Sequence, residues 1–283
     1  MRCCIGTAPS LNYFYQGESE LKTEYETLKV ELDGHLGVVT LNRPTAGNAL
    51  NTQMLEELIH LFADLYVQPG QVRCLVVTGA GEKIFCAGGD LKERNGMTDE
   101  AWRRQHALTE QMIRHIRECP LPVVVAINGA AFGGGCELAV AADFAYAATT
   151  ARFALTEVTL GIIPGAGGTQ NLPRACGLAR AKEIALTGLP FTAQEALQWG
   201  VVNKVCEPDQ LMAEARATGH RIAGNAPIAV RQAKKSLNAS TDLDFASGYR
   251  FELEAYYRTI PTKDRLEGVL AFNEKRKPAF TGE

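Results

Sequence analysis

The stretch Val123-Val-Val-Ala-Ile-Asn-Gly-Ala-Ala-Phe-Gly-Gly-Gly-Cys-Glu137 gives the first indication of the fold. Its first five residues form a continuous apolar run, which predicts a β-strand covered on both faces. Three consecutive glycines follow, and after Glu137 the sequence Leu-Ala-Val-Ala-Ala predicts a helix. A buried strand that leads through a glycine turn into a helix is typical of α/β proteins.

The segments upstream alternate in the same way. Asp33-Gly34 lies between two segments of alternating hydrophobicity and predicts a β-hairpin. Asn51 or Thr52 is expected to cap a helix whose apolar stripe ends near Gln68-Pro-Gly70. The apolar run 74–78 then predicts another buried strand. Because strands and helices alternate, the sequence predicts an α/β architecture.

The second half of the chain has a different character. From about Ala193, with Thr192 as its cap, the sequence predicts an almost wholly helical segment. We therefore expect three parts: a poorly ordered N-terminal extension over residues 1–24, an α/β domain over 25–205 and a helical domain over 206–283.

The composition excludes several classes of protein. Of 283 residues, 46% are hydrophobic and 22% charged, which excludes disordered, collagen-like and coiled-coil chains. Lys and Arg number 29 against 32 Asp and Glu, and this net charge of −3 argues against a nucleic-acid partner. The longest apolar stretch, from Leu121, is interrupted at Asn128, well short of the ~20 residues that span a membrane. No membrane partner is expected.

The eight cysteines form no CxxC pair, and the histidines lack the spacing of metal ligands. We therefore expect no metal site. Most of these cysteines lie in apolar segments, where a free thiol behaves as a small buried hydrophobe. This use of cysteine fits a reducing compartment, and we expect a cytoplasmic protein.

Three widespread motifs are absent from the sequence. All five serines, at positions 10, 19, 236, 240 and 247, lie outside the turns of the α/β segment, which excludes a GxSxG hydrolase. The phosphate-binding pattern GxxxxGK[ST] does not occur. Gly79-Ala-Gly81 follows a predicted strand but lacks the third glycine of a dinucleotide-binding turn.

Three glycine-dense turns, at residues 86–90, 132–137 and 164–169, each follow a predicted strand. Any one of them alone could be a tight strand-to-helix turn. Glycine also lets the backbone approach a ligand closely, so that amide groups can converge on a negative oxygen. We expect the three turns to meet at one site.

Glu137 and Glu157 are the acidic residues that stand out, because small or apolar residues surround both. Taken singly, Glu137 could complement a helix dipole and Glu157 could be a solvated loop carboxylate. A buried carboxylate is costly unless it is paired or protonated. Together, beside glycine turns, the two residues predict an acid/base pair with separated pKa values.

Several longer motifs include or accompany these turns: Leu41-Asn-Arg-Pro44, Asn48-Ala-Leu50, Phe85-Cys-Ala-Gly-Gly-Asp-Leu-Lys92, Asn128 through Leu138 and Leu160 through Gln170. In these motifs the chain resembles the crotonase superfamily, also called the enoyl-CoA hydratase/isomerase family. The resemblance covers about residues 27–283, and the motifs follow the family's order. Two motifs near the end, Ile260-Pro-Thr-Lys-Asp-Arg-Leu-Glu-Gly268 and Ala271-Phe-Asn-Glu-Lys-Arg276, resemble the branch that contains 3-methylglutaconyl-CoA hydratases.

The resemblance implies an α/β spiral of ββα units followed by a C-terminal helical domain that assembles homotrimers, usually paired as hexamers. It implies that the backbone amides of Gly89 and Gly134 hold the thioester oxygen of an acyl-CoA. Gly89 stands where the family more often has alanine. The two glutamates of hydratases match Glu137 and Glu157, with Glu157 as proton donor to C2 and Glu137 as the residue that activates water.

The resemblance also implies a binding site for the CoA part of the substrate, with no separate cofactor. Phosphate groups would favour Lys275, although a solvated helix end also explains the run 275–277. The expected CoA-binding residues are Ala46, Ala87, Asp90, Leu91 and Lys92, together with Phe272 and Lys275 from the C-terminal helix of the same or a neighbouring subunit.

The sequence therefore predicts a hydro-lyase that adds water to 2-enoyl-CoA thioesters in fatty-acid or branched-chain amino-acid breakdown. The alternatives are an enoyl-CoA isomerase, a 3-methylglutaconyl-CoA hydratase, or a non-catalytic scaffold that binds acyl-CoA or RNA. Two retained glutamates favour water addition. A methylglutaconyl substrate needs a cation for its free carboxylate, and Arg94 or Arg152 could supply it, although we expect a surface role for both.

Overall fold

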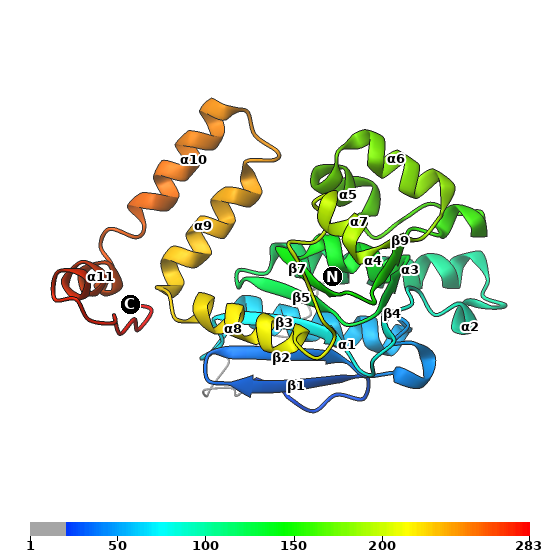
Figure 1. Ribbon diagram of the computed structural model, residues 1–283, viewed down its shortest axis with the longest axis horizontal. Helices are drawn as coiled ribbons and strands as arrows, with labels where there is room; N and C mark the ends of the chain where they lie inside the picture. Colours follow the sequence, from blue (N-terminus) through cyan, green and yellow to red (C-terminus); the bar gives the residue numbers. More distant parts are fainter. Residues whose placement is uncertain (1–20) are drawn as a thin grey trace, which may run out of the picture.

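The computed structural model describes residues 21–283, in which helices surround two β-sheets (Figure 1). The larger sheet has the strand order β1-β2-β3-β5-β7-β10, and the smaller has the order β4-β6-β8-β9. The larger sheet contains β1 (Leu28–Asp33), β2 (Leu36–Leu41), β3 (Cys74–Gly79), β5 (Val123–Ile127), β7 (Phe144–Ala148) and β10 (Lys204–Cys206). The smaller sheet contains β4 (Ile84–Cys86), β6 (Ala130–Phe132), β8 (Arg152–Ala154) and β9 (Phe191–Thr192).

The helices fall into a group around the sheets and a C-terminal group. Around the sheets lie η1 (Pro44–Ala46), α1 (Thr52–Val67), α2 (Leu91–Arg94), α3 (Asp99–Glu118), α4 (Gly134–Ala141), η2 (Glu157–Leu160), α5 (Gly168–Cys176), α6 (Leu178–Thr187), α7 (Ala193–Gln198) and α8 (Leu211–Ala223). The C-terminal group consists of α9 (Pro227–Ala239), α10 (Phe245–Tyr257) and α11 (Lys263–Asn273).

From β3 to β8, consecutive strands alternate between the two sheets. β3, β5 and β7 are parallel neighbours in the larger sheet, and the strand after each of them, β4, β6 or β8, lies in the smaller sheet. Helical segments after β4 and β6 lead back to the next strand of the larger sheet, so this part of the chain repeats a ββα turn. This arrangement confirms the predicted α/β spiral fold.

Local sequence signals place several elements correctly. Gly34, with φ of 60°, closes the antiparallel hairpin of β1 and β2. Asn51 caps α1 because its side chain accepts a hydrogen bond from the amide of Met54. Thr192 caps α7 in a reciprocal capping box with Glu195. The predicted buried strands 74–78 and 123–127 are β3 and β5, whose residues are all buried.

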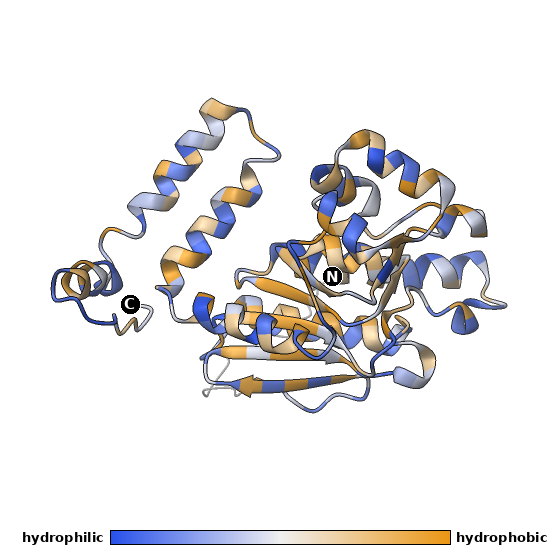
Figure 2. Ribbon diagram, in the orientation of Figure 1, coloured by the Kyte–Doolittle hydropathy of each residue, from blue (hydrophilic) through white to orange (hydrophobic). Residues whose placement is uncertain are grey.

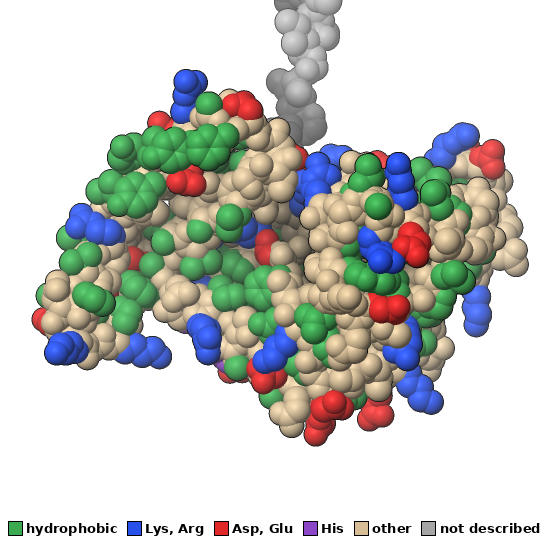
Figure 3. All heavy atoms as spheres, turned by 45° about the horizontal axis from the view of Figure 1, so that its top comes forward, with side chains coloured by type: hydrophobic (Ala, Val, Ile, Leu, Met, Phe, Trp, Pro, Cys, Tyr) green, Lys and Arg blue, Asp and Glu red, His purple; other side chains and the backbone are tan. Residues whose placement is uncertain are grey.

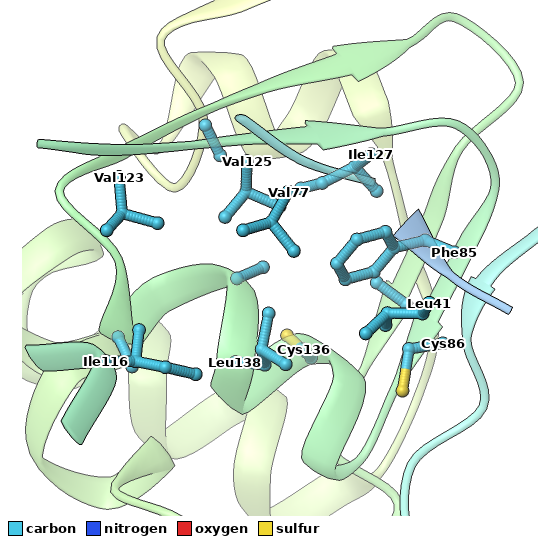
Figure 4. Packing of buried hydrophobic residues seen from close by; sticks show 14 of the residues in the cluster. Leu41, Val77, Phe85, Cys86, Ile116, Val123, Val125, Ile127, Cys136 and Leu138 are labelled. Carbon is cyan, nitrogen blue, oxygen red and sulfur yellow. The ribbon is translucent and has the colours of Figure 1, made fainter. Parts of the chain in front are cut away.

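The main hydrophobic core lies between the two sheets and the helices that cover them (Figure 2). Valines of β3 and β5 face Phe85, Cys86 and Leu138, which come from the segments on either side of the glycine turns (Figure 4). The turns that follow β4 and β6 therefore pack directly against a close-packed core, and this packing fixes the direction of their amide groups.

The structure differs from the sequence predictions in two places. The turn 164–169 follows the 3-10 helix η2, not a strand as predicted, and α5 begins inside it at Gly168. The C-terminal half also holds β10, which pairs in parallel with β7 and ends at the expected domain boundary. Of the predicted extension 1–24, residues 1–20 lie outside the described part, while Glu24 bridges to Lys29.

The helices α9 and α10 form an antiparallel pair that stands away from the sheets, with α11 beyond them (Figure 1). A salt bridge attaches α9 to the body, because the buried Lys234 side chain donates to Asp143 Oδ2 at 2.7 Å. Hydrophobic side chains gather over these C-terminal helices at the left of Figure 3. Large exposed hydrophobic residues here include Phe245, Tyr249, Tyr256, Tyr257, Leu266, Val269, Leu270 and Phe272.

None of the helices within residues 21–283 combines the length and the hydropathy that a membrane span requires.

Candidate active site

The three glycine turns meet at one cavity of about 520 Å³, as the sequence predicted. Gly88 and Gly89 contribute from the first turn, Gly133 and Gly134 from the second, and Gly165 from the third. The remaining walls come from α2, α3, η2 and the loop that follows η2. A concave site built from several loops on a rigid core is the usual form of a small-molecule site.

The first two turns approach so closely that side chains cannot separate them. A Cβ atom on Gly88 would lie 2.7 Å from the carbonyl oxygen of Phe132, and Gly88 has φ of 90°. The carbonyl of Gly88 accepts a hydrogen bond from Leu50, and the amide of Asp90 donates one back to Leu50. These bonds fix both neighbours of Gly89 and thereby orient its own amide.

The amides of Gly89 and Gly134 are both free to bind a ligand. None of the hydrogen bonds within residues 21–283 uses the Gly89 amide. Gly134 is the first residue of α4, where an amide has no acceptor inside its helix. The position of a Cβ on Gly134 lies 3.7 Å from the Gly89 nitrogen, so the two turns are in contact. Two such donors can hold one negatively charged oxygen.

Glu137 lies in the first turn of α4 and is only 2% exposed. Its Oε1 accepts hydrogen bonds from the amides of Ala166 and Gly168, both at 2.8 Å. Burial raises the pKa of Glu137 to about 7, the charge of Glu157 adds to the effect, and the two amide bonds oppose it. At neutral pH this carboxyl group can therefore both give and accept a proton.

Glu157 begins η2 and is 8% exposed. Its Oε2 is buried without a hydrogen-bond partner in the described part of the chain. A Cβ on Gly133 would lie 3.1 Å from its Oε1, so the glycine turn makes room for this carboxyl group. Burial raises the pKa of Glu157. A buried carboxyl oxygen that the fold leaves unsatisfied, in the wall of a cavity, points to a ligand or a reacting water as its partner.

Arg94 also faces the cavity, so the expectation that it has a surface role is wrong. Its Nε donates to Oε1 of Gln105 at 2.7 Å, and its guanidinium lies over the ring of Trp102, 4.8 Å from the centroid. Both partners come from α3. Arg152, in contrast, is an exposed residue of β8 that does not line the cavity.

The predicted CoA-binding residues of the first half lie around the mouth of the cavity. Ala87 and Leu91 line it, and the exposed Lys92 lines an adjoining groove that shares Leu91 with the cavity. Ala46 precedes Gly47, whose carbonyl accepts a hydrogen bond from the Ala87 amide at 3.0 Å. Ala46 and Lys92 therefore lie close in the chain to residues that contact or line the cavity wall.

The side chain of Asp90 points into the fold. Its carboxylate accepts a hydrogen bond from Arg43 Nη1 at 2.9 Å and caps α2 through the amides of Lys92 and Glu93. The arginine hydrogen bond opposes the effect of burial, and the net result is a lowered pKa for Asp90. Asp90 holds the turn that carries Gly89, so any effect on CoA binding would pass through that turn.

Phe272 and Lys275 do not reach the cavity of their own chain. They lie in and directly after α11, at the end of the molecule opposite α2 and α3 (Figure 1). Phe272 is 83% exposed, and Lys275 takes a left-handed conformation with φ of 57°. A site role for these residues requires a second subunit, which was one of the two possibilities that the resemblance left open.

The wall formed by α3 is a part of the site that was not predicted from the sequence. Gln105 and Thr109 are buried polar residues on the same stripe of α3 as Met112 and Ile116. Polar residues within an apolar helical stripe were a usable signal, because buried polar groups need partners. Within residues 21–283, no group of three His, Cys, Asp or Glu side chains could hold a metal ion.

Comparisons with known proteins agree with this geometry. Residues 31–283 match the family model described as enoyl-CoA hydratase/isomerase. A crystal structure of enoyl-CoA hydratase from Bacillus anthracis, 44% identical, superposes with a TM-score of 0.89 and covers 91% of this chain and 100% of its own. The short-chain-enoyl-CoA hydratase of Clostridium acetobutylicum is 40% identical over 90% of this chain and 97% of its own length.

A human relative is the mitochondrial enoyl-CoA hydratase domain-containing protein 2, which is 42% identical over 87% of this chain and 85% of its own. With a family match that spans nearly the whole chain, the protein belongs to the enoyl-CoA hydratase/isomerase family and has the crotonase fold.

Proposed function

We propose that the cavity hydrates 2-enoyl-CoA thioesters and that Glu137 and Glu157 share the proton transfers. The chain is an enoyl-CoA hydratase, a hydro-lyase, in keeping with relatives of that name at about 40% identity. The observation that carries the proposed site is the pair of buried carboxyl groups in different surroundings, set in one cavity with two free backbone amides.

The amides of Gly89 and Gly134 hold the thioester oxygen of the bound substrate. When water adds at C3, negative charge moves onto that oxygen, and each preorganised donor lowers the barrier by about 3 kcal/mol. Because the donors belong to turns fixed on the core, they need little reorganisation during the reaction.

Glu137 and Glu157 divide the proton transfers. Glu137, anchored through Oε1, holds water with its other oxygen and takes a proton as the C3–O bond forms. Glu157 delivers its proton to C2, and the C2–C3 double bond becomes single. Acid and base catalysis of this kind contributes about 10²–10⁴-fold to the rate. The reverse sequence removes water, so the reaction is reversible.

The direct test follows the loss of the enoyl-thioester ultraviolet band on hydration of crotonyl-CoA by the wild type, Glu137→Gln and Glu157→Gln. We expect each substitution to lower kcat by at least about 10²-fold. Unchanged rates in both variants would refute the proposal. An isomerase that uses only the second glutamate would instead keep its double-bond isomerisation activity in Glu137→Gln.

Binding measurements address a non-catalytic scaffold that holds acyl-CoA or RNA. RNA binding that weakens steeply with salt, together with absent hydration, would favour that reading. The net charge of −3 and the retained glutamates count against it.

For the substrate, we extend the proposal to the 3-methylglutaconyl-CoA hydratase branch. Support comes from the motifs at 260–268 and 271–276, which resemble that branch. Such a substrate carries a second, free carboxylate, and the cavity has to supply a cation for it. Turnover of 3-methylglutaconyl-CoA at least as efficient as that of crotonyl-CoA is the expected result.

We also propose a homotrimer or a hexamer. Exposed hydrophobic side chains on α10 and α11 support an association of these helices with other copies, and Phe272 and Lys275 are too far from their own cavity to act there. Sedimentation analysis would reveal three or six chains.

The six described cysteines are free thiols, which supports the proposed cytoplasmic location.

A further inference from the structure

We propose that Gly89 and Arg94 act as a pair that selects acyl groups bearing a carboxylate: the glycine leaves room for the guanidinium at the wall of the cavity, and the guanidinium binds the carboxylate. This inference rests on the proposed hydratase function and adds a specificity-determining residue to it. Arg94 sits at the end of α2, five residues beyond the amide that holds the thioester oxygen.

The space above Gly89 is filled by Arg94. A Cβ atom on Gly89 would lie 2.9 Å from Nη1, 3.0 Å from Cζ and 3.2 Å from Nη2 of that side chain. All three distances are shorter than ordinary van der Waals contacts. An alanine at position 89, which the family more often has there, would therefore require the guanidinium to move. Glycine at position 89 leaves the space that the guanidinium occupies.

The guanidinium is held in this place from two sides. Gln105, itself 4% exposed, accepts from Nε and in turn donates to Glu93 Oε2 at 2.6 Å and to Thr52 Oγ1 at 3.1 Å. The ring of Trp102 covers one face of the guanidinium. Movement of Arg94 would break the hydrogen bond to Gln105 and the ring contact, so Gly89 and these two α3 residues together fix its place.

The two Nη groups are left without an acidic partner. Across residues 21–283, no carboxylate lies within 4.0 Å of Arg94, because Glu93 bonds to Gln105 and to the Thr52 amide, and Asp90 pairs with Arg43. Burial lowers the pKa of Arg94, and the charges of Glu93 and Asp90 oppose this effect. An arginine remains charged in this setting. A partly desolvated cation with unused donors favours an anionic ligand.

A carboxylate on the acyl group fits this cation better than the thioester oxygen does. The thioester oxygen already has two amide donors, whereas a carboxylate matches the planar fork of a guanidinium with two parallel hydrogen bonds. The α3 wall near Arg94 also presents the polar side chains of His106 and Thr109.

The experiment compares kcat/KM for 3-methylglutaconyl-CoA and for crotonyl-CoA, which has no second carboxylate, in the wild type, Arg94→Gln, Arg94→Lys and Gly89→Ala. The matched control is Arg104→Gln, an exposed α3 arginine whose ion pair is with Glu100 on the same helix. Loss of a hydrogen bond to a charged group corresponds to a drop of about 10–100-fold. Circular dichroism verifies that each variant is folded.

We expect Arg94→Gln to lower kcat/KM for 3-methylglutaconyl-CoA by about 10–100-fold more than it lowers kcat/KM for crotonyl-CoA. Arg94→Lys should recover part of the loss, and Gly89→Ala should shift the preference in the same direction as Arg94→Gln. The inference would be overturned if Arg94→Gln lost the same factor on both substrates or kept the wild-type preference. It would also be overturned if the wild type hydrated only crotonyl-CoA. A wild type that hydrates neither substrate would instead overturn the proposed function, and the inference with it.

Discussion

Replacement of Glu137 by Gln should remove the loss of stability that this residue causes between pH 5 and pH 8, and it should also remove activity. In the unfolded chain a glutamate titrates near its ordinary pKa of 4.5, whereas burial raises the pKa of Glu137 to about 7. Between these values the folded state binds more protons at this residue than the unfolded state does. Stability contributed by Glu137 therefore falls as pH rises from about 4.5 to about 7 and is lowest above that range.

The size of the effect follows from the same two values. A pKa difference of about 2.5 corresponds to at most about 3 kcal/mol, at 1.36 kcal/mol for each unit. Glutamine cannot ionise, but its side-chain oxygen can still accept from the amides of Ala166 and Gly168. The variant keeps these bonds and lacks the charge, so its free energy of unfolding should not show this loss with rising pH.

Urea unfolding of the wild type and of Glu137→Gln at pH 5 and pH 8, at one protein concentration, measures this difference. The difference between the two proteins at pH 8, minus that at pH 5, removes the constant effect of the new amide group. We expect glutamine to gain on the order of 2–3 kcal/mol relative to glutamate over this interval. Equal pH dependence in both proteins would show that Glu137 does not titrate as a buried carboxyl group, and the acid/base assignment would lose its physical basis.

Three further changes test the site and its supports. Gly133→Ala should lower kcat for crotonyl-CoA by at least about 10²-fold with a much smaller change in KM. A Cβ at this position lies 3.1 Å from Glu157 Oε1, and alanine disfavours the φ of 50°. A normal kcat would contradict the role of the Glu157 carboxyl group. Lys234→Met removes the ion pair with Asp143 and the hydrogen bond to the Leu121 carbonyl, and should lower the free energy of unfolding by about 1–2 kcal/mol in urea titrations. An unchanged midpoint would mean that α9 does not depend on this salt bridge. Phe272→Glu should reduce the assembled fraction in sedimentation, and a fully assembled variant would count against association through α11.

The parts of the fold that sequence predicted well depend on interactions between near neighbours. Asn51 caps α1 through a residue three positions away, and Gly34 closes a hairpin between adjacent strands. The continuous apolar run of β5 records burial on both faces, which holds for any arrangement of the surrounding layers. Such signals can be recognised in the sequence without knowledge of the tertiary structure.

The candidate site was predictable where it lies on those local elements. Glycine turns after β4 and β6, and a glutamate in the first turn of α4, all appear as short patterns in the sequence. The turn 164–169 was assigned to the site correctly but to the wrong preceding element, because η2 is too short to leave a helical period in the sequence.

Arg94 shows why the rest of the site was not predictable. In the sequence it is one charged residue of a polar stretch, and such residues are usually solvated. Its position depends on Gln105, which lies eleven residues further along, and on the missing Cβ of Gly89, which lies five residues earlier. Neither neighbour signals an arginine by itself. Only the packing of α3 against the first glycine turn brings the three together. The position of Arg94 therefore depends on contacts between elements, whereas each glycine turn and the glutamate of α4 can be recognised within a single short segment.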